Sequence, residues 1–139
     1  MSFEFNPERY NQRGYLQIFQ MTIGGKTGNV GDRTPSLWIH STRGVYIATT
    51  LNGRASVGKF FRGFPPVGEW TSIEISQAKQ DFSYIFSVTI GGEEIWSVAN
   101  SKPEEFSDVK VYASSPWYLA QAGAIRGLQI ENKIRGKIF

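Results

Sequence analysis

The sequence predicts an all-β fold, an antiparallel β-sandwich with little or no helix. Apolar and polar residues alternate with a period of two, turn residues separate short apolar runs, and no helical period appears. Fifteen glycines and six prolines are spread along the 139 residues, which suits many turns between short strands. No linker or low-complexity segment divides the chain. We therefore expect one domain over residues 1–139, with 1–13 and 131–139 as flanking or edge segments.

The clearest predicted strand spans Phe82–Ile90, where every even position is large and apolar and most odd positions are Ser or Thr. Gly91 and Gly92 then turn the chain, and the return over Glu93–Ala99 predicts a hairpin. About nine or more short strands separated by turns indicate a sandwich or barrel. The other expected strands are Gly14–Ile23, Leu37–His40, Val45–Leu51, Trp70–Ser76, Asp108–Ala113 and Ala124–Ile130.

Composition excludes several kinds of chemistry. The chain has no cysteine, so it offers no thiol nucleophile. A serine triad would have to use the single histidine, His40, and no Gly-x-Ser-x-Gly elbow motif accompanies it. A glycosidase needs two carboxylates aimed at one bond, whereas Glu93–Glu94 and Glu104–Glu105 are adjacent and lie in turns or point to opposite faces. We therefore expect no enzymatic activity.

The charge pattern and the hydropathy narrow the expected partners. The net charge of +3 comes from scattered basic residues, not from the concentrated basic stripe that indicates nucleic-acid binding. No run is long and apolar enough for a membrane span, and the first residues lack the charged, apolar and small-residue pattern of a signal peptide, so we expect none in this chain. We expect no nucleic-acid partner and no membrane span.

Five segments in order carry a family resemblance: "TGNVGDRTPSLWI", "GVYIATTLNGR", "GEWTSIEISQ", "YIFSVTIGGEEIWSVAN" and "FSDVKVYASSPWYLAQAGAIRGLQI". Over Tyr15–Ile130 the chain resembles the concanavalin-like, laminin-G-like jelly-roll modules of animal extracellular proteins. The resemblance implies two facing antiparallel sheets, rim loops that bind glycan or protein, no catalysis, and rim calcium in some members. It also implies an extracellular or cell-surface location within a larger secreted protein. The galectin sugar motif is missing, because Ser41, Thr42 and Arg43 follow His40.

The loop around Trp117 and Tyr118 is the first candidate site. An aromatic ring there is either a platform that stacks on a sugar, with Gln121 as a polar neighbour, or a lid over the apolar end of the sandwich. We expect Trp117 to be buried against the strand ends as a plug. We expect Tyr118 to be partly exposed beside Gln121.

The second candidate is the aromatic and basic loop expected over Gly58–Trp70. Alternation fails in this segment, so its rings cannot all face one core, and a contiguous exposed aromatic patch usually marks an interface. Its basic residues would attract anionic partners such as sulfated glycans or acidic proteins. The residues proposed to contact a partner are Lys59, Phe61, Arg62 and Phe64.

Calcium is the one metal that the sequence allows. Asn29 and Asp32 in a glycine-rich loop offer an amide and a carboxylate, although the alternative is a local turn with an ion pair between Asp32 and Arg33. No other cofactor is expected. Taken together, the sequence predicts a lectin-like adhesion or carbohydrate-binding module that recognises a glycan or an extracellular protein through rim loops. The alternative is a structural domain that self-assembles into a homo-oligomer.

Overall fold

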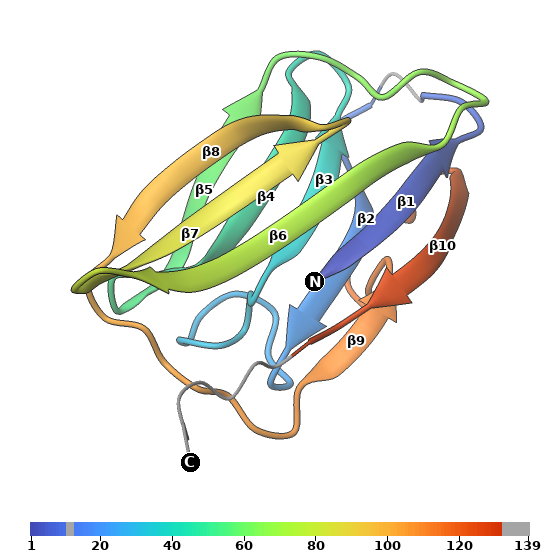
Figure 1. Cartoon of the computed structure of the whole chain (residues 1–139). Helices are drawn as coiled ribbons and strands as arrows, with labels where there is room; N and C mark the ends of the chain where they lie inside the picture. The colour runs from blue at the N-terminus through green and yellow to red at the C-terminus, as the bar shows by residue number, and fades with distance from the viewer. Residues whose placement is uncertain (11–12, 132–139) are drawn as a thin grey trace.

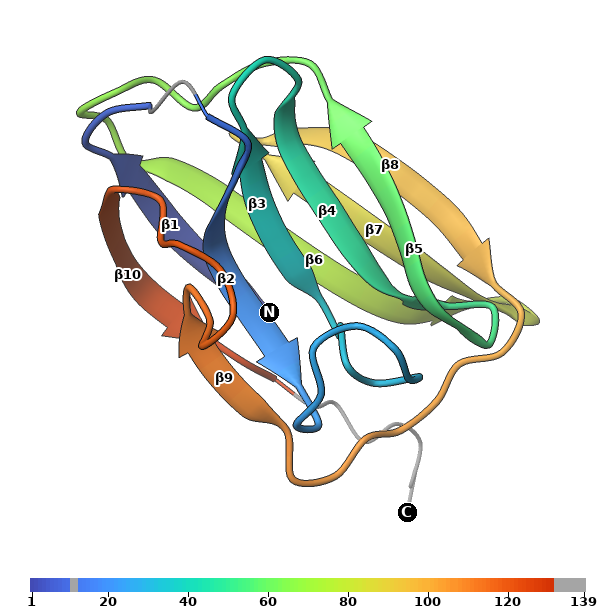
Figure 2. The same ribbon diagram turned by 180° about the vertical axis from the view of Figure 1, so that it is seen from behind.

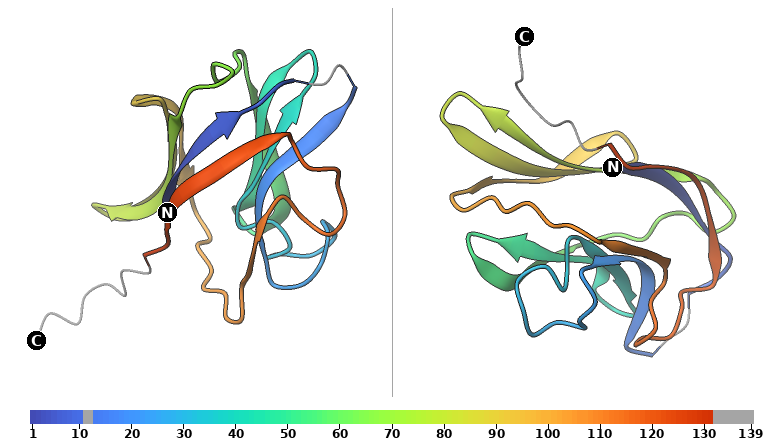
Figure 3. Two further views of the ribbon diagram at one scale, coloured as in Figure 1. Left: turned by 90° about the vertical axis from the view of Figure 1, so that its right-hand side faces the viewer. Right: turned by 90° about the horizontal axis from the view of Figure 1, so that it is seen from below.

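The computed structural model describes residues 1–10 and 13–131 of the chain. These residues form ten strands in two five-stranded antiparallel sheets and contain no helix, so the predicted all-β sandwich is confirmed. The two layers are seen edge-on in Figure 3. The strands are β1 (Ser2–Pro7), β2 (Tyr15–Thr22), β3 (Ser36–His40), β4 (Gly44–Leu51), β5 (Arg54–Phe61), β6 (Thr71–Gln80), β7 (Ser83–Ile90), β8 (Glu93–Asn100), β9 (Lys110–Ala113) and β10 (Gly123–Gln129).

The first sheet has the strand order β10-β1-β6-β7-β8, and the second has the order β5-β4-β3-β2-β9. Figures 1 and 2 show that β8 and β5 are the sheet edges on one side of the sandwich, while β10 and β9 are the edges on the other. The jelly-roll connectivity implied by the family resemblance stays a prediction.

Two strands lie where none was expected. The segment over residues 1–13 was expected to be flanking or at an edge, yet β1 lies inside the first sheet between β10 and β6. Phe3 and Phe5 alternate with Glu4 and bury their rings in the core, and this burial makes β1 an inner strand. β5 was missed because the segment before Gly58 carries small and polar residues. The tail expected as an edge segment over 132–139 lies outside the described residues.

The core lies between the sheets and is built from the inward side chains of each strand. Phe3 of β1 stacks on Phe19 of β2 with ring centroids 5.2 Å apart. At the other side of the core Trp96 meets Phe86 edge-on, with centroids 5.3 Å apart. The remaining buried members of the cluster are Phe5, Ile18, Leu37, Ile39, Val45, Ile47, Leu51, Ile73, Ile75 and Val88.

A β-bulge in β2 resolves a conflict in its sequence pattern. Strict alternation would place Ile18 and Phe19 on opposite faces, yet both belong to the core. The pairing with β3 shifts register between Gln17 and Phe19, and such a bulge inserts one unpaired residue. Gln17 and Gln20 consequently lie on the outward side, where both are fully buried.

The predicted hairpin is confirmed, because Gly91 and Gly92 join β7 to β8 with φ of 60° and 83°. A second turn ties the two sheets together. The Asn100 side-chain oxygen at the end of β8 accepts a hydrogen bond from the Asn52 backbone N–H at 3.0 Å. Asn52 in turn accepts one from the Ser101 backbone N–H at 2.7 Å, so the β4–β5 turn is anchored to the opposite sheet.

Two phenylalanines test the core directly. Phe19 is 1% exposed and Phe82 is 101% exposed, although alternation predicted a buried Phe82; the residue lies in the β6–β7 turn, before β7 begins. We expect Phe19→Ala to lower the free energy of unfolding by about 3–5 kcal/mol, as large core truncations do. Phe82→Ala should change it by less than about 0.5 kcal/mol. Urea unfolding of both variants measures this, and equal losses would contradict the placement of the core.

Candidate functional site

Aromatic side chains gather on the outward face of the second sheet. Leu37 and Ile39 of β3 fill the core, so alternation turns Trp38 outward. Trp38 pairs with Tyr46 of β4, and Tyr46 pairs with Phe60 of β5. The ring centroids are 5.5 Å and 4.5 Å apart in these two contacts. Three neighbouring strands therefore present one continuous row of rings.

Further rings extend this row at both ends. Tyr15 of β2 is 42% exposed and meets the Tyr46 ring edge-on at 5.8 Å. His40 lies 4.7 Å from the Tyr15 ring. Tyr118 approaches Trp38 from the loop after β9, with ring centroids 5.8 Å apart. We call this set the aromatic face: Tyr15, Trp38, His40, Tyr46, Phe60 and Tyr118.

Three cations lie over rings of the aromatic face. The Arg33 guanidinium is 4.6 Å from the Trp38 ring centroid, and that of Arg43 is 3.5 Å from the Phe60 centroid. The Lys26 ammonium is 5.0 Å from the Tyr118 centroid. A ring quadrupole attracts a cation in this position. Positive charge therefore accompanies the rings along the whole face.

Gly58 of β5 leaves room for the Tyr46 ring. A Cβ atom at this position would lie 1.9 Å from the Tyr46 hydroxyl oxygen, which is far inside van der Waals contact. The ring therefore lies flat across β5, and burial there raises the pKa of Tyr46 above its ordinary value.

A buried polar network holds two loops against β2. The Gln17 side chain donates to the Gln20 side-chain oxygen at 2.6 Å, and Gln20 donates to the Asp32 carbonyl at 3.1 Å. The Ser115 hydroxyl donates to the Gln17 side-chain oxygen. Both loops, 23–35 and 114–122, can be followed in Figure 2. Through them the network positions Arg33 and Tyr118 over Trp38.

Three polar atoms near Trp38 are buried without a hydrogen-bond partner in the structure: Arg33 Nε, Ser36 Oγ and Trp38 Nε1. Buried polar groups are normally paired, because an unmade hydrogen bond costs free energy. Two of these atoms are N–H donors. Arg33 Nε–H and Trp38 Nε1–H are therefore free to donate a hydrogen bond to a ligand.

Trp117 does not plug the end of the sandwich. The residue is partly buried, as Tyr118 is, but it is not among the side chains that pack against the core cluster, so the expected role as a plug over the apolar core is wrong. The loop instead continues the sheet edge beyond the short strand β9. The Ser114 N–H donates to the Ile18 carbonyl, the Gln17 N–H to the Leu119 carbonyl, and the Gln121 N–H to the Gln17 carbonyl. These bonds satisfy backbone groups of β2 that β9 does not reach.

Tyr118 and Gln121 take different roles. Tyr118 is half-buried, as expected, and its hydroxyl oxygen lies 3.4 Å from Arg33 Nη2, which donates to it. Gln121 is buried, and its amide nitrogen donates to the Arg9 and Ala122 carbonyls. Tyr118 therefore belongs to the aromatic face, whereas Gln121 anchors the loop to the chain between β1 and β2. Gln121 stays only a predicted ligand contact.

The structure places the residues of the predicted aromatic and basic loop partly on β5 and partly in the loop after it. Lys59 and Phe61 lie on β5, not in a loop, and the ammonium of Lys59 is 5.6 Å from the Phe61 ring centroid. Phe61 packs against the core, 6.2 Å from Trp96. A cavity of about 220 Å³ opens at this end of the sandwich. We call it the rim cavity; it is lined by Phe61, Arg62, Phe64, Val45, Gly63, Pro65, Pro66, Thr71, Ile90, Glu93 and Ile95.

Tyr10 holds in place the loop with Phe64 and Pro65, which lines part of the rim cavity. Its hydroxyl donates to the Pro65 carbonyl, and its ring lies 5.0 Å from that of Phe64. Burial raises the pKa of Tyr10 to about 12, because the charged phenolate is disfavoured away from water.

The proposed calcium ligands close a local turn. The Asp32 side chain is buried and accepts a hydrogen bond from the Asn29 backbone N–H at 2.8 Å. The alternative to calcium is confirmed for the local turn but is wrong for the ion pair: the ion pairs among the described residues do not include Asp32–Arg33, because Arg33 lies over Trp38. Within the same part of the chain no three His, Asp or Glu side chains group to hold a metal. Calcium stays a prediction.

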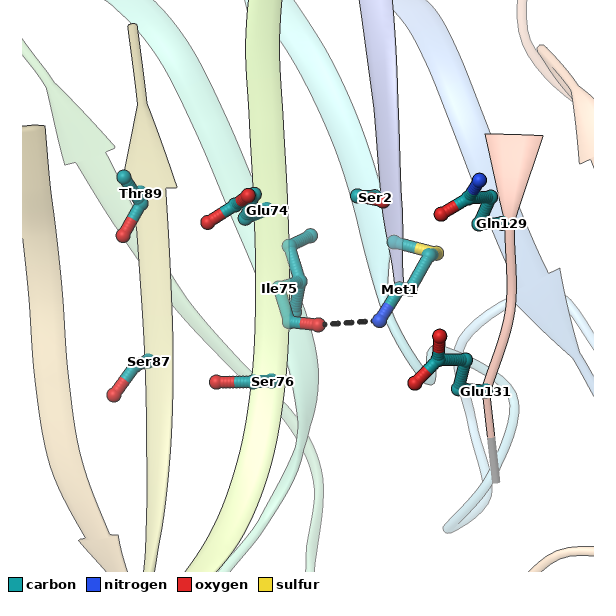
Figure 4. A pocket seen from close by; sticks show the side chains of 9 residues that line it. All are labelled: Met1, Ser2, Glu74, Ile75, Ser76, Ser87, Thr89, Gln129 and Glu131. Atoms are coloured by element: carbon teal, nitrogen blue, oxygen red, sulfur yellow. Dashed lines mark hydrogen bonds between the residues drawn. The ribbon is translucent and has the colours of Figure 1, made fainter. Parts of the chain in front are cut away.

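The outward face of the first sheet is different in character. Figure 4 shows hydroxyl, amide and carboxylate side chains from β1, β6, β7 and β10, together with Glu131 just after β10, around a polar cavity of about 240 Å³. Thr89, Glu74, Ser2 and Gln129 lie in register across these strands. The amine of Met1 donates to the Ile75 carbonyl at 2.9 Å. The cavity carries no aromatic ring, so the two outward faces offer different chemistry.

Comparisons with known proteins identify no relative: no family model, curated protein or solved structure matches the chain. The part of the chain that the structure describes has no helix that could span a membrane.

Sequence reasoning missed most of the aromatic face. Trp38 and Tyr46 were assigned to predicted strands without a role, and Phe60 was assigned to a loop. The signal was present in Leu37–Ile39, three consecutive large apolar residues, because a strand that is apolar in both phases is buried on both faces.

Replacing Gly58 by alanine should disturb the aromatic face. The added Cβ must displace the Tyr46 ring, which is packed between Trp38 and Phe60, so we expect Gly58→Ala to lower the free energy of unfolding by about 1–3 kcal/mol. Gly28, with nothing within 4 Å of its Cβ position and no positive φ, is the matched control. Gly28→Ala should leave stability within about 0.5 kcal/mol of wild type. Equal unfolding curves for both variants would contradict the contact.

Tyr10 should make stability depend on alkaline pH. Its folded pKa of about 12 lies above the ordinary value of 10.0, so the folded state retains a proton that the unfolded state releases. Its contribution is complete below pH 10 and is lost as the pH rises toward 12. Tyr46 shifts in the same direction. Urea unfolding at about pH 9 and about pH 11 should show a smaller alkaline loss in Tyr10→Phe than in wild type; an identical loss would disprove the assignment.

Proposed function

We propose that the chain is a non-catalytic module that binds a glycan on the aromatic face. The observation that carries this proposal is the continuous row formed by Trp38, Tyr46 and Phe60 on neighbouring strands. Amphipathic ligands are held by apolar ring surface together with a few placed polar groups. The apolar C–H face of a pyranose matches such a ring, and the hydroxyls of Tyr46 and Tyr118 supply polar contacts.

The exposure of the rings supports binding on this face. Trp38 is 2% exposed and forms the floor, while Tyr46 and Phe60 are half-buried and Tyr15 is exposed. Ligand contact would therefore fall on Tyr15, Tyr46 and Phe60. The rim loops supply Tyr118 but are not the main surface in this proposal.

The placement of the carboxylates supports a non-catalytic role. Glu93 and Glu94 are adjacent on β8, so their side chains do not converge on one bond. The resemblance to laminin-G-like jelly-roll modules supports the same role, with an extracellular or cell-surface location. The protein partner that the sequence predicts near Arg62 and Phe64, which line the rim cavity, stays a prediction.

Self-association is the second candidate, and the open sheet edges favour it. β5 and β8 are edge strands on the same side of the sandwich. β5 carries Arg54 and Lys59, whereas β8 carries Glu93 and Glu94. Unpaired edges of opposite charge could pair between two copies. Light scattering after size exclusion tests this: a dimer that dissociates on Glu93→Lys/Glu94→Lys substitution would support it.

The aromatic face predicts a defined loss of binding. We expect the double variant Tyr46→Ala/Phe60→Ala to lose binding to any glycan that scores on an array, because it removes two of the three rings in the row. If each ring stacked on the sugar contributes as much as an aromatic pair, about 0.5–1.5 kcal/mol, the affinity should fall about fivefold to a hundredfold. The array identifies the glycan, and isothermal titration measures its affinity.

The matched control is Phe82→Ala, which removes a fully exposed ring in the turn between β6 and β7 of the first sheet. It should bind as wild type does. Unchanged binding by the double variant, with its fold retained by circular dichroism, would reject the aromatic face as the site. Failure of wild type to bind any glycan would reject the proposed function itself.

A further inference from the structure

We infer that the glycan held by the aromatic face is acidic, a polysaccharide that carries sulfate or carboxylate groups. This inference rests on the proposed function and names the chemical class of the ligand. It follows from the charges around the face, from its unpaired donors and from the spacing of its cations.

The charged side chains on the strands of the second sheet have one sign. None of the five strands of the second sheet, all within the described residues, contains Asp or Glu. The first sheet contains Glu4, Glu74, Glu93 and Glu94. Asp32 lies in a flanking loop, but its buried carboxylate is bonded to the Asn29 backbone. A surface with cations and no competing carboxylates concentrates anions.

The cations on the aromatic face keep their charge available. Lys26 and Arg43 are exposed and lie over rings instead of pairing with carboxylates. The ion pairs among the described residues involve neither of them, nor Arg33. Cations bound to ring faces still offer N–H donors to an incoming anion. Hydrogen bonds between such groups and sulfate or carboxylate oxygens are stronger than neutral ones.

The unpaired atoms point to the same ligand class. Arg33 Nε and Trp38 Nε1 can only donate hydrogen bonds, so a partner must supply acceptor oxygens. Sulfate and carboxylate oxygens only accept, whereas sugar hydroxyls are both donors and acceptors. A small shift of Tyr118, whose hydroxyl contact with Arg33 is 3.4 Å long, would open these donors to an anionic group.

The spacing of the cations requires a ligand longer than one sugar ring. The Arg33 guanidinium lies over Trp38 of β3 and that of Arg43 over Phe60 of β5, and Tyr46 of β4 lies between these two rings. Two strand spacings of about 4.8 Å therefore separate the two ring positions by about 10 Å. A ligand that reaches both cations while a ring stacks on Tyr46 or Phe60 is therefore an oligosaccharide with more than one charged residue.

Dextran and dextran sulfate provide the test, because they share one backbone and differ in charge. We expect wild type to bind dextran sulfate at least about tenfold more tightly than dextran, with an affinity that falls as salt is raised. Lys26→Gln/Arg43→Gln should reduce dextran sulfate binding about tenfold or more, since each charged hydrogen bond contributes strongly. Both residues are exposed, so the variant should keep its fold. Hyaluronan and heparin then separate carboxylate from sulfate recognition, and binding of either supports the inference.

The control variant Lys79→Gln/Arg126→Gln removes the same charge from the first sheet, where Arg126 likewise lies over a ring, 4.0 Å from the Trp70 centroid. It should bind as wild type does. An equal loss in this control would show nonspecific ion exchange and overturn the inference, as would equal affinity for single-stranded DNA. Equal affinity for dextran would also overturn it, while leaving glycan binding intact.

Discussion

Trp38 imposes the constraint on which the second sheet depends. It lies on the central strand between Leu37 and Ile39, which point into the core, so its large ring must point away from the core. An indole left in water there would forgo a large gain in burial. The ring is nevertheless 2% exposed, because Arg33, Tyr46 and Tyr118 cover it. The second sheet is thus buried on both faces at its centre.

The burial of Trp38 depends on two loops and on the bulge in β2, which are far apart along the chain. Arg33 and Tyr118 come from two loops, and both loops are fastened by Gln17 and Gln20. These glutamines face outward only because the bulge in β2 sends Ile18 and Phe19 together into the core. The network is buried, so its side chains must be paired to be tolerated. Core packing and the candidate site are therefore linked through one irregular strand.

The two outward faces differ in a way that is consistent with the proposed binding module. The second sheet carries a continuous row of rings with three cations, whereas the first carries the in-register side chains of Thr89, Glu74, Ser2 and Gln129 in Figure 4. A face that only needs solvation requires no aromatic row. The exposed parts of Tyr15, Tyr46 and Phe60 extend beyond what covering Trp38 demands. This surplus of ring surface is the physical basis for assigning ligand contact to the second sheet.

The sequence by itself determined the fold class and most strand positions, since a period of two and glycine turns are local properties. Ile73 and Ile75, for example, are buried between exposed neighbours, as their alternation predicts. Residues 37–39 are all large and apolar, so their pattern does not say which of them face the core. Only the tertiary structure decided that Leu37 and Ile39 point inward and Trp38 outward. It also decided that β1 is an inner strand and that the loop carrying Trp117 runs along β2. These depend on contacts between residues distant in sequence, which no local pattern encodes.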